Sequence, residues 1–444
     1  KVIWSKSKQC YIVVSEIAKN KTGKKKIVVA GIFAALAMVN GGQATFAAWP
    51  AGKEEAQSAF WIGRGASASG QNAQAIGVAA KAMYNKAVAI GSDSSATSYV
   101  SGSTVVGATA VGGHSNANGP GAVALGYSTN ASVGYSTAIG TSTSVSGQYG
   151  IGIGWNTSVS ADNSTAIGVQ SRAAKAGATA MGPSARGYGE GALSLGYQAL
   201  AGADVYGSGI NVNNNPSDDN TNTINNYAKW GDAAIGLRAV ATGGNATALG
   251  RSARAAAANA IAIGGGNGNS ATDNTEKTEA TGEKATAIGY NAKAGAEKST
   301  AIGASATANG LDSFAGASGT ASGAASVAIG KVSKATDSSA TAVGDGTSAL
   351  GQGATALGSN ATAKNGFDLA VGRSVTSEGG AATVVGYNSN VKGNQSTGMG
   401  SGINITSQKA TGIGYQVNVS GDNAIGIGSS GDSTFVTASG ASSI

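Results

Sequence analysis

The chain has 444 residues, of which 72 are glycine, 11% are charged and only 5% are aromatic. Its net charge of +7 lies entirely in residues 1–48, which hold eight lysines and one glutamate, and the remainder holds 21 basic and 21 acidic residues. A neutral remainder excludes nucleic acid or an anionic membrane surface as the partner. The single cysteine, Cys10, excludes an intrachain disulfide.

Residues 1–22 begin with the segment KVIWSK at positions 1–6, followed by QCYIVVSEIAK at positions 9–19. This segment resembles the extended signal peptide region that precedes the signal sequence in type V secreted proteins of diderm bacteria. The resemblance implies export across the inner membrane.

Residues 23–48 have the pattern of a secretory signal peptide. Lys24, Lys25 and Lys26 precede a stretch from Ile27 to Val39 that is apolar or small throughout, and alanines near position 47 offer cleavage sites. Thirteen residues are too few to span a bilayer. We therefore expect a mature protein that starts near Trp49, without Cys10, with residues 49–62 as its N-terminal segment.

From residue 63 to 444 the chain repeats a tripeptide of alanine, an aliphatic residue and glycine. The aliphatic residue, which we call the marker, recurs after fourteen residues in sixteen of twenty-one intervals. The markers are Ile76, Ile90, Val106, Leu125, Ile139, Ile153, Ile167, Met181, Leu195, Ile235, Leu249, Ile263, Ile288, Ile302, Ile329, Val343, Leu357, Val371, Val385, Met399, Ile413 and Ile427. A fixed short period means that each repeat is one unit that stacks on its neighbours.

Each repeat reads as a β coil of two short strands and two turns. A second run with alternating small or β-branched residues follows the marker strand, as in Thr157 and Val159, and glycines such as Gly147 and Gly310 separate the runs. Hexapeptide helices do not fit a period of fourteen, and calcium-binding rolls need an aspartate in every coil. The fold class is therefore all-β, a solenoid of 14-residue coils.

The inward positions of such a coil are mostly Ala, Ser and Thr with one aliphatic residue. One chain then has little apolar area to offset the entropy lost on folding, so we expect several chains to associate about one axis. We expect the markers to form the core of the repeat: Ile76, Ile90, Ile139, Ile153, Ile167, Ile263, Ile302, Leu357, Ile413 and Ile427.

The repeat unit at Asn163–Gly168, NSTAIG, and the similar units at 259–264 and 325–330 resemble the YadA-like head repeats of trimeric autotransporter adhesins. The resemblance implies a left-handed parallel β-roll, a homotrimer, and a surface adhesin that binds host matrix proteins of the collagen, fibronectin or laminin type, or other bacterial cells. Asn163, Ser164 and Thr165 are the nearest match to the family's collagen-associated repeat and are candidate ligand contacts.

Members of this family end in a stalk and an outer-membrane anchor of four strands per chain. No heptad run or such segment is present up to Ile444. We therefore expect a fragment of a longer protein, attached to the outer membrane only through a C-terminal anchor outside this sequence.

Two insertions, 197–233 and 265–284, interrupt the repeat. Insertions in solenoids project as loops, and the simplest interpretation is a tolerated excursion. Alternatively, Tyr227 and Trp230 belong to a ligand-contact patch, because aromatic residues on polar surfaces are common binding anchors. Trp230 could equally fill the gap where the loop rejoins the roll.

No constellation for catalysis is present in the sequence. The one histidine, His114, lies in a glycine-rich stretch without a nearby cysteine or carboxylate cluster, and acidic residues are spread singly through turns. We expect no enzymatic activity, no cofactor and no metal site. The chain is then an adhesin head that binds through many weak contacts; the alternative is a non-binding spacer or protective coat rod.

Overall fold

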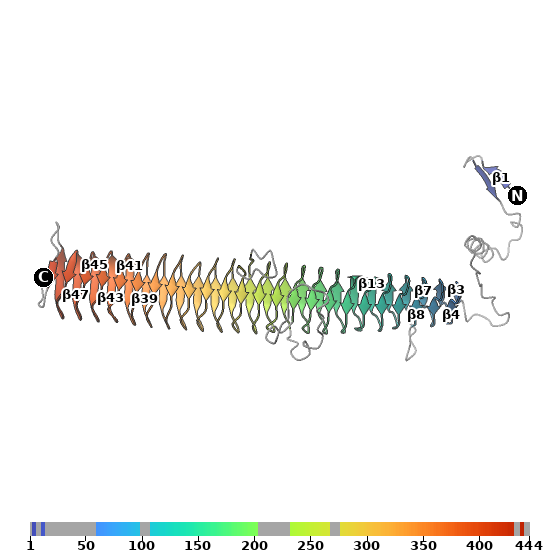
Figure 1. Ribbon diagram of the computed structural model, residues 1–444, viewed down its shortest axis with the longest axis horizontal. Helices are drawn as coiled ribbons and strands as arrows, with labels where there is room; N and C mark the ends of the chain where they lie inside the picture. Colours follow the sequence, from blue (N-terminus) through green and yellow to red (C-terminus); the bar gives the residue numbers. More distant parts are fainter. Residues whose placement is uncertain are drawn as a thin grey trace. The chain divides into compact units, whose positions relative to one another are not determined.

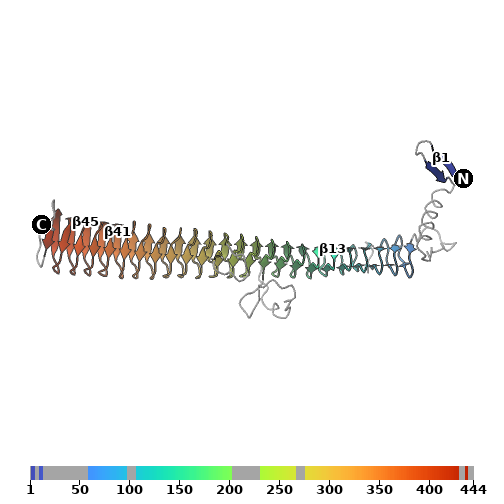
Figure 2. The ribbon, with the colours of Figure 1, turned by 45° about the horizontal axis from the view of Figure 1, so that its top comes forward.

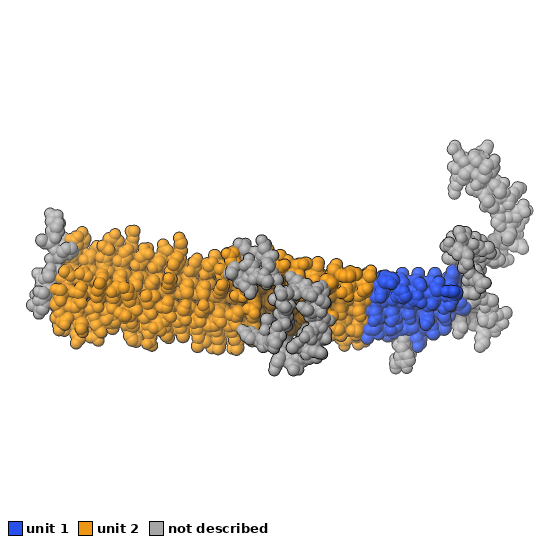
Figure 3. All heavy atoms as spheres, in the orientation of Figure 1, with its two compact units in different colours: residues 1–135 blue, residues 136–444 orange. Residues whose placement is uncertain are grey.

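The computed structural model describes residues 59–97, 107–202, 231–266 and 276–429, and the backbone of residues 2–5, 10–13 and 436–438. The chain divides into two compact units, residues 1–135 and 136–444 (Figure 3). Near the N-terminus, β1 (Val2–Ser5) pairs with β2 (Cys10–Val13) as an antiparallel hairpin. Among the described residues all regular structure is β, and none forms a helix that could span a membrane.

From β3 onward the strands of each unit form a parallel β-solenoid, in which odd-numbered strands form a first sheet and even-numbered strands a second sheet. In the first unit the first sheet contains β3 (Phe60–Ile62), β5 (Gln74–Ile76), β7 (Val88–Ile90), β9 (Thr109–Val111) and β11 (Val123–Leu125). Its second sheet contains β4 (Ser67–Ala68), β6 (Lys81–Ala82), β8 (Ser95–Ala96), β10 (Asn116–Ala117) and β12 (Asn130–Ala131).

The second unit repeats the same arrangement over more coils, stacked one on the next (Figures 1 and 2). Its first sheet contains β13 (Thr137–Thr141), β15 (Ile151–Trp155), β17 (Thr165–Ile167), β19 (Thr179–Met181), β21 (Leu193–Leu195), β23 (Ala233–Ile235), β25 (Thr247–Leu249), β27 (Ile261–Ile263), β29 (Thr286–Ile288), β31 (Thr300–Ile302), β33 (Phe314–Gly316), β35 (Val327–Ile329), β37 (Thr341–Val343), β39 (Thr355–Leu357), β41 (Leu369–Arg373), β43 (Thr383–Tyr387), β45 (Thr397–Ser401), β47 (Thr411–Tyr415) and β49 (Ile425–Ser429).

The second sheet of this unit contains β14 (Ser144–Val145), β16 (Ser158–Val159), β18 (Arg172–Ala173), β20 (Arg186–Gly187), β22 (Leu200–Ala201), β24 (Val240–Ala241), β26 (Arg254–Ala255), β28 (Glu279–Ala280), β30 (Lys293–Ala294), β32 (Thr307–Ala308), β34 (Thr320–Ala321), β36 (Lys334–Ala335), β38 (Ser348–Ala349), β40 (Thr362–Ala363), β42 (Thr376–Ser377), β44 (Asn390–Val391), β46 (Asn404–Ile405), β48 (Val417–Val419) and β50 (Val436–Ala438). The predicted solenoid of about 14 residues per coil is confirmed.

Two turns connect the sheets in every coil, and the backbone requires glycine in the first of them. Gly344, directly after a marker, has a φ of +133°, and a Cβ added there would lie 1.6 Å from the carbonyl oxygen of Gly358 in the next coil. Only a residue without a side chain permits this stacking. This explains why the marker is followed by glycine.

The interior of the solenoid consists mainly of alanine. In the first sheet Ala75 and Ala89 are fully buried, and in the second sheet Ala82 and Ala96 are. Buried hydroxyl groups close the turns; for example, Thr157 Oγ1 donates to the carbonyl oxygen of Gly168 at 2.7 Å. The hydrogen bonds of the parallel strands and of these hydroxyl groups pair the backbone N–H and C=O groups that are buried away from water.

The markers do not form the core of the single chain, which corrects the sequence-based expectation. Ile302 is 42% exposed and Ile413 and Ile427 are each 37% exposed, while the residue before each marker, Ala301, Gly412 or Gly426, is buried. The others of the set are half-buried, namely Ile76, Ile90, Ile139, Ile153, Ile167, Ile263 and Leu357. Alternation along a strand separates the two faces, and only the small residue fits between two closely packed sheets.

One marker and one additional coil differ from the sequence-based assignment. Val106 lies outside the described residues; the strand that pairs with Ile90 and Leu125 ends at Val111. Between Ile302 and Ile329 the coil strand β33 carries Gly316 at the marker position, so a coil without an aliphatic marker was missed.

The coil strands also reach into segments that the sequence analysis had set apart. β3 lies within residues 49–62 and already pairs with β5. β22 lies within the predicted insertion 197–233, and β28 lies within the predicted insertion 265–284, where Glu279 pairs with Arg254 in register. The departures from the coil are thus shorter than the intervals between markers indicate.

Candidate functional site

The two outer faces of the solenoid differ in chemistry. On the first sheet, each strand presents its marker outward beside the residue two positions earlier, which is usually threonine or an aliphatic residue, as in Thr300 and Ile302. The markers Leu249, Met399 and Ile329 are 42%, 45% and 38% exposed. This apolar column runs along the first sheet within each unit, and we call it the marker face.

The outer face of the second sheet is polar. Its most regular part lies on five consecutive coils, where residues of neighbouring strands pair in register: Thr362, Thr376, Asn390, Asn404 and Asn418. The Asn404 side-chain amide donates to Asn418 Oδ1 at 3.0 Å. We call this row the amide ladder. Its hydroxyl and amide groups can donate and accept hydrogen bonds at each coil spacing of about 4.8 Å.

Two groups of charges on or beside the second sheet form ion pairs. Glu279 Oε1 lies 3.5 Å from Arg254 Nη1 and 2.9 Å from Lys277 Nζ. Beside the amide ladder, Lys364 forms an ion pair with Glu378 of the next coil. The amide ladder itself consists of uncharged side chains that form hydrogen bonds, which suits a neutral polar partner.

One part of the second sheet is apolar. Tyr188 and Leu200 are 8% and 6% exposed and form a small cluster with Ala174 and Val240. This cluster interrupts the polar row between Arg186 and Arg254, so the polar face is not uniform along the second unit.

The structure does not bring the candidates Asn163, Ser164 and Thr165 together. Asn163 is exposed in a turn with a φ of 55°. Ser164 is fully buried, and its hydroxyl donates to the carbonyl oxygens of Lys175 at 2.7 Å and Asp162 at 3.1 Å. Thr165 lies on the first sheet, beside the marker column. Of the three residues, only Asn163 is fully exposed on the single chain, and Thr165 is half-buried.

The other two candidates, Tyr227 and Trp230, lie outside the described residues. Their role in a ligand-contact patch stays a prediction.

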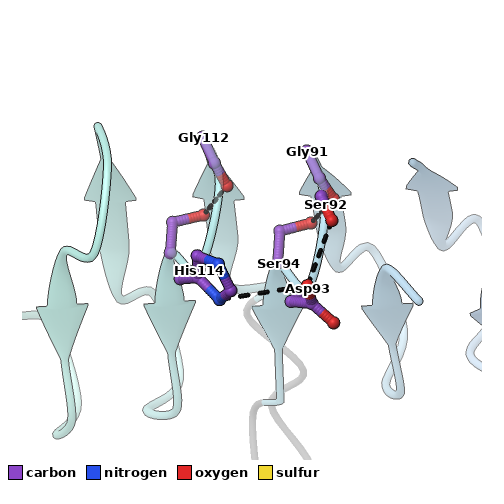
Figure 4. A network of polar contacts seen from close by, with 7 residues as sticks. Gly91, Ser92, Asp93, Ser94, Gly112 and His114 are labelled. Atoms are coloured by element: carbon purple, nitrogen blue, oxygen red, sulfur yellow. Dashed lines mark hydrogen bonds and ion pairs between the residues drawn. The ribbon is translucent and has the colours of Figure 1, made fainter. Parts of the chain in front are cut away.

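His114 has a neighbour that the sequence did not reveal. Figure 4 shows it facing Asp93 of the preceding coil, with 3.9 Å between His114 Nδ1 and Asp93 Oδ2. The imidazole also meets the ring of Tyr127 edge-on at 5.6 Å between centroids. His114 and Asp93 are both about half exposed, at 55% and 51%. A single exposed pair of this kind belongs to the surface and supplies no acid and base aimed at a pocket.

Exposed aromatic residues at the edges of the first sheet were also missed. They occupy the position two residues after a marker, at Tyr127, Trp155, Tyr197, Tyr290, Tyr387 and Tyr415, with exposures between 40% and 59%. The sequence signal was available: an aromatic residue follows the glycine of the marker tripeptide in each case.

Neighbouring groups shift pKa values on the surface near residues 276–290. The phenol of Tyr290 donates a hydrogen bond to Glu276, and this bond raises the pKa of Tyr290. Lys284 Nζ lies 2.9 Å from Glu283 Oε1; the hydrogen bond between them lowers the pKa of Glu283 and raises the pKa of Lys284. These shifts follow from neighbouring charges on an open surface. Within the described ranges, no group of His, Cys, Asp or Glu side chains could hold a metal ion.

Comparison with known families accounts for both parts of the chain. The model of the extended signal peptide of type V secretion systems matches residues 1–44. The model of the YadA head domain repeat, which spans two copies, matches residues 106–129, 117–143, 134–157, 146–171, 160–185, 234–267, 280–306, 294–315, 321–347, 344–363 and 349–374. No curated protein matches the chain.

Proposed function

Because this chain belongs to the trimeric autotransporter adhesins, which type V secretion delivers to the cell surface, we propose that its solenoid is the homotrimeric binding head of such an adhesin. The family is one of adhesins and is not an enzyme class. The observation that carries the proposal is the contrast between the marker face and the polar second sheet.

Association of three copies through the marker face explains why large aliphatic side chains remain about 40% exposed in one chain. Full burial of such a side chain contributes about 1.5–3 kcal/mol, so the exposed share is worth about 0.5–1 kcal/mol per coil. Summed over the coils of the second unit, this gain is of the same order as or larger than the cost of association, about 4–15 kcal/mol. The markers then become the core of the assembly.

The second sheet is left to face the partner. The coils of the amide ladder repeat similar hydroxyl and amide groups, and a trimer would present them three times around the head. Many weak contacts with one extended partner give strong attachment, because later contacts form at high effective concentration. We propose host matrix proteins of the collagen, fibronectin or laminin type, or other bacterial cells, as partners, and attachment to the outer membrane through a C-terminal anchor.

Light scattering on the mature chain tests the assembly, and solid-phase binding to matrix proteins tests the adhesin role. We expect a mass of three chains and saturable binding that weakens when Asn390, Asn404 and Asn418 are replaced together by aspartate. A control triple replacement of Ser67, Ser95 and Ser144, on second-sheet strands of other coils, should weaken binding less. A trimer that binds no matrix protein and no bacterial cell would instead support the spacer.

A further inference from the structure

In the coil of β15, large exposed aromatic residues stand on both edges of the first sheet. β15 ends at Trp155, which is 51% exposed, and Tyr149, which is 53% exposed, lies in the turn just before that strand begins. Ile151 between them is also 39% exposed. The coil therefore presents apolar side chains across the whole width of the marker face, from one turn to the other.

The pattern recurs elsewhere along the chain. In the second-turn position that Tyr149 occupies, three described coils carry an exposed aromatic residue: Tyr135, Tyr149 and Phe367. Each lies within about one coil of an exposed aromatic residue on the opposite edge: Tyr127 in the first unit, and Trp155 and Tyr387 in the second.

Phe367 has a strained backbone. It has a φ of 61°, in the left-handed region that costs a bulky residue energy, and it is 69% exposed. Neighbouring coils have Gly353 and Ala381 at the same position. A strained and exposed phenylalanine points to a contact outside the chain.

Within one chain the two edges cannot meet. Six residues separate Tyr149 from Trp155 along an extended strand, which is roughly 20 Å at about 3.3 Å per residue. A partner that touches both edges at one level must approach from the side of the marker face.

We infer that these aromatic edges contact each other between neighbouring copies of the chain, so that Trp155 of one copy packs on Tyr149 of the next. The inference rests on the proposed homotrimer. In a cyclic assembly with the marker face toward the axis, the first-turn edge of each copy lies beside the second-turn edge of the next, and pure rotation keeps them at the same level. Offset or edge-on packing of two rings is favourable.

An arginine adjoins Tyr387, the exposed aromatic residue nearest to Phe367 on the opposite edge. Arg373, at the end of β41, places its guanidinium carbon 5.9 Å from the ring centroid of Tyr387 on the next coil. Phe367 lies two residues before the start of β41, so the neighbouring copy's Phe367 would lie at the level of this cation and ring. The arrangement adds a cation–π layer to the aromatic contact.

Disulfide mapping on the mature full chain tests the pairing, because no cysteine occurs after Cys10. We expect oxidised Tyr149→Cys/Trp155→Cys to run as covalent dimers and trimers on a denaturing gel, and each single variant to run as a monomer. The matched control, Tyr149→Cys/Pro183→Cys, places the second cysteine two coils away and should remain monomeric.

Alanine variants supply a second measurement. Trp155→Ala should raise the concentration at which trimers dissociate about tenfold. Tyr197→Ala should leave it unchanged, because the opposite edge carries Gly191 at that level. A trimeric double-cysteine variant without crosslinks, or equal crosslinking of the control, overturns the pairing and leaves the proposed trimer intact. If light scattering finds that the native chain is monomeric, both the pairing of the aromatic edges and the proposed trimer are wrong.

Discussion

Gly398 faces Val391 across the interior of the solenoid: a Cβ added at Gly398 would lie 2.7 Å from Val391 Cγ2 and 3.0 Å from Ile403 Cγ2. Most coils have alanine on both inner sides. Several inward valine and isoleucine residues of the second sheet have a glycine opposite them on the first sheet, as at Gly152 opposite Val145. Paired changes of this kind limit the variation of core volume between coils.

Gly398→Ala is therefore expected to overpack its coil and lower the free energy of unfolding by about 1–3 kcal/mol. Thermal unfolding followed by circular dichroism measures the loss. Gly366→Ala is the control, because the nearest atom to its added Cβ is the Gln352 carbonyl oxygen at 3.6 Å. Equal stability of both variants would contradict the volume rule.

Val332→Asn should stabilise the protein by about 1 kcal/mol. Val332 has a φ of 57°, where a β-branched residue is strained and asparagine is tolerated. Asn360 occupies the same turn position with a φ of 53°, so Asn360→Val should lower stability by a similar amount. Chemical denaturation of both variants checks the two signs; a destabilised Val332→Asn would show that this turn does not impose the strain.

Ile302→Lys should dissociate the proposed trimer at micromolar concentration and leave the β circular dichroism spectrum of the coils intact. A lysine on the marker face would be desolvated in the assembly and would meet two copies of itself. The control is Thr307→Lys on the second sheet of the same coil, since Lys293 already occupies that position in the preceding coil. Light scattering that finds Ile302→Lys trimeric would place the interface elsewhere.

Glu276→Gln should lower the pKa of Tyr290 toward its ordinary value, because the hydrogen bond to the carboxylate favours the protonated phenol. A phenol with a raised folded-state pKa stabilises the fold below its unfolded pKa, and this contribution is lost as pH rises through the folded-state value. Tyrosine-selective NMR titration, with Tyr290→Phe to assign the signal, gives the direction. An unchanged pKa in Glu276→Gln would show that the carboxylate is not the cause.

Much of the architecture was predictable because the coil is local and periodic. The interval between markers set the coil length, and the glycine after the marker identified the turn that has no room for a side chain. Alternation could separate Ala301 from Ile302 onto opposite faces, but it could not decide which face was inside. That choice depends on the distance between the two sheets, which the sequence pattern does not state.

Contacts between coils were harder to predict than the coils themselves. His114 and Asp93 lie on adjacent coils, but residues 98–106 stand between these two coils in the sequence. The contact between the two side chains therefore could not be recognised from the 14-residue period. The motif Asn163–Thr165 was grouped because its residues are consecutive, yet consecutive residues in a turn and strand point to different sides. A candidate site in this fold must be assembled across coils at one register position.

The uniform register of the second unit allows the chain to lengthen or shorten by whole coils. Each first-sheet strand there pairs only with the strands one coil before and one coil after, and Thr341 and Thr355 occupy the same register position. Removing residues 341–354 would join Ala340 to Thr355 and return every later side chain to the face it held before. Gain or loss of whole coils can therefore adjust the reach of the protein from the cell in steps of about 4.8 Å, without any compensating mutation.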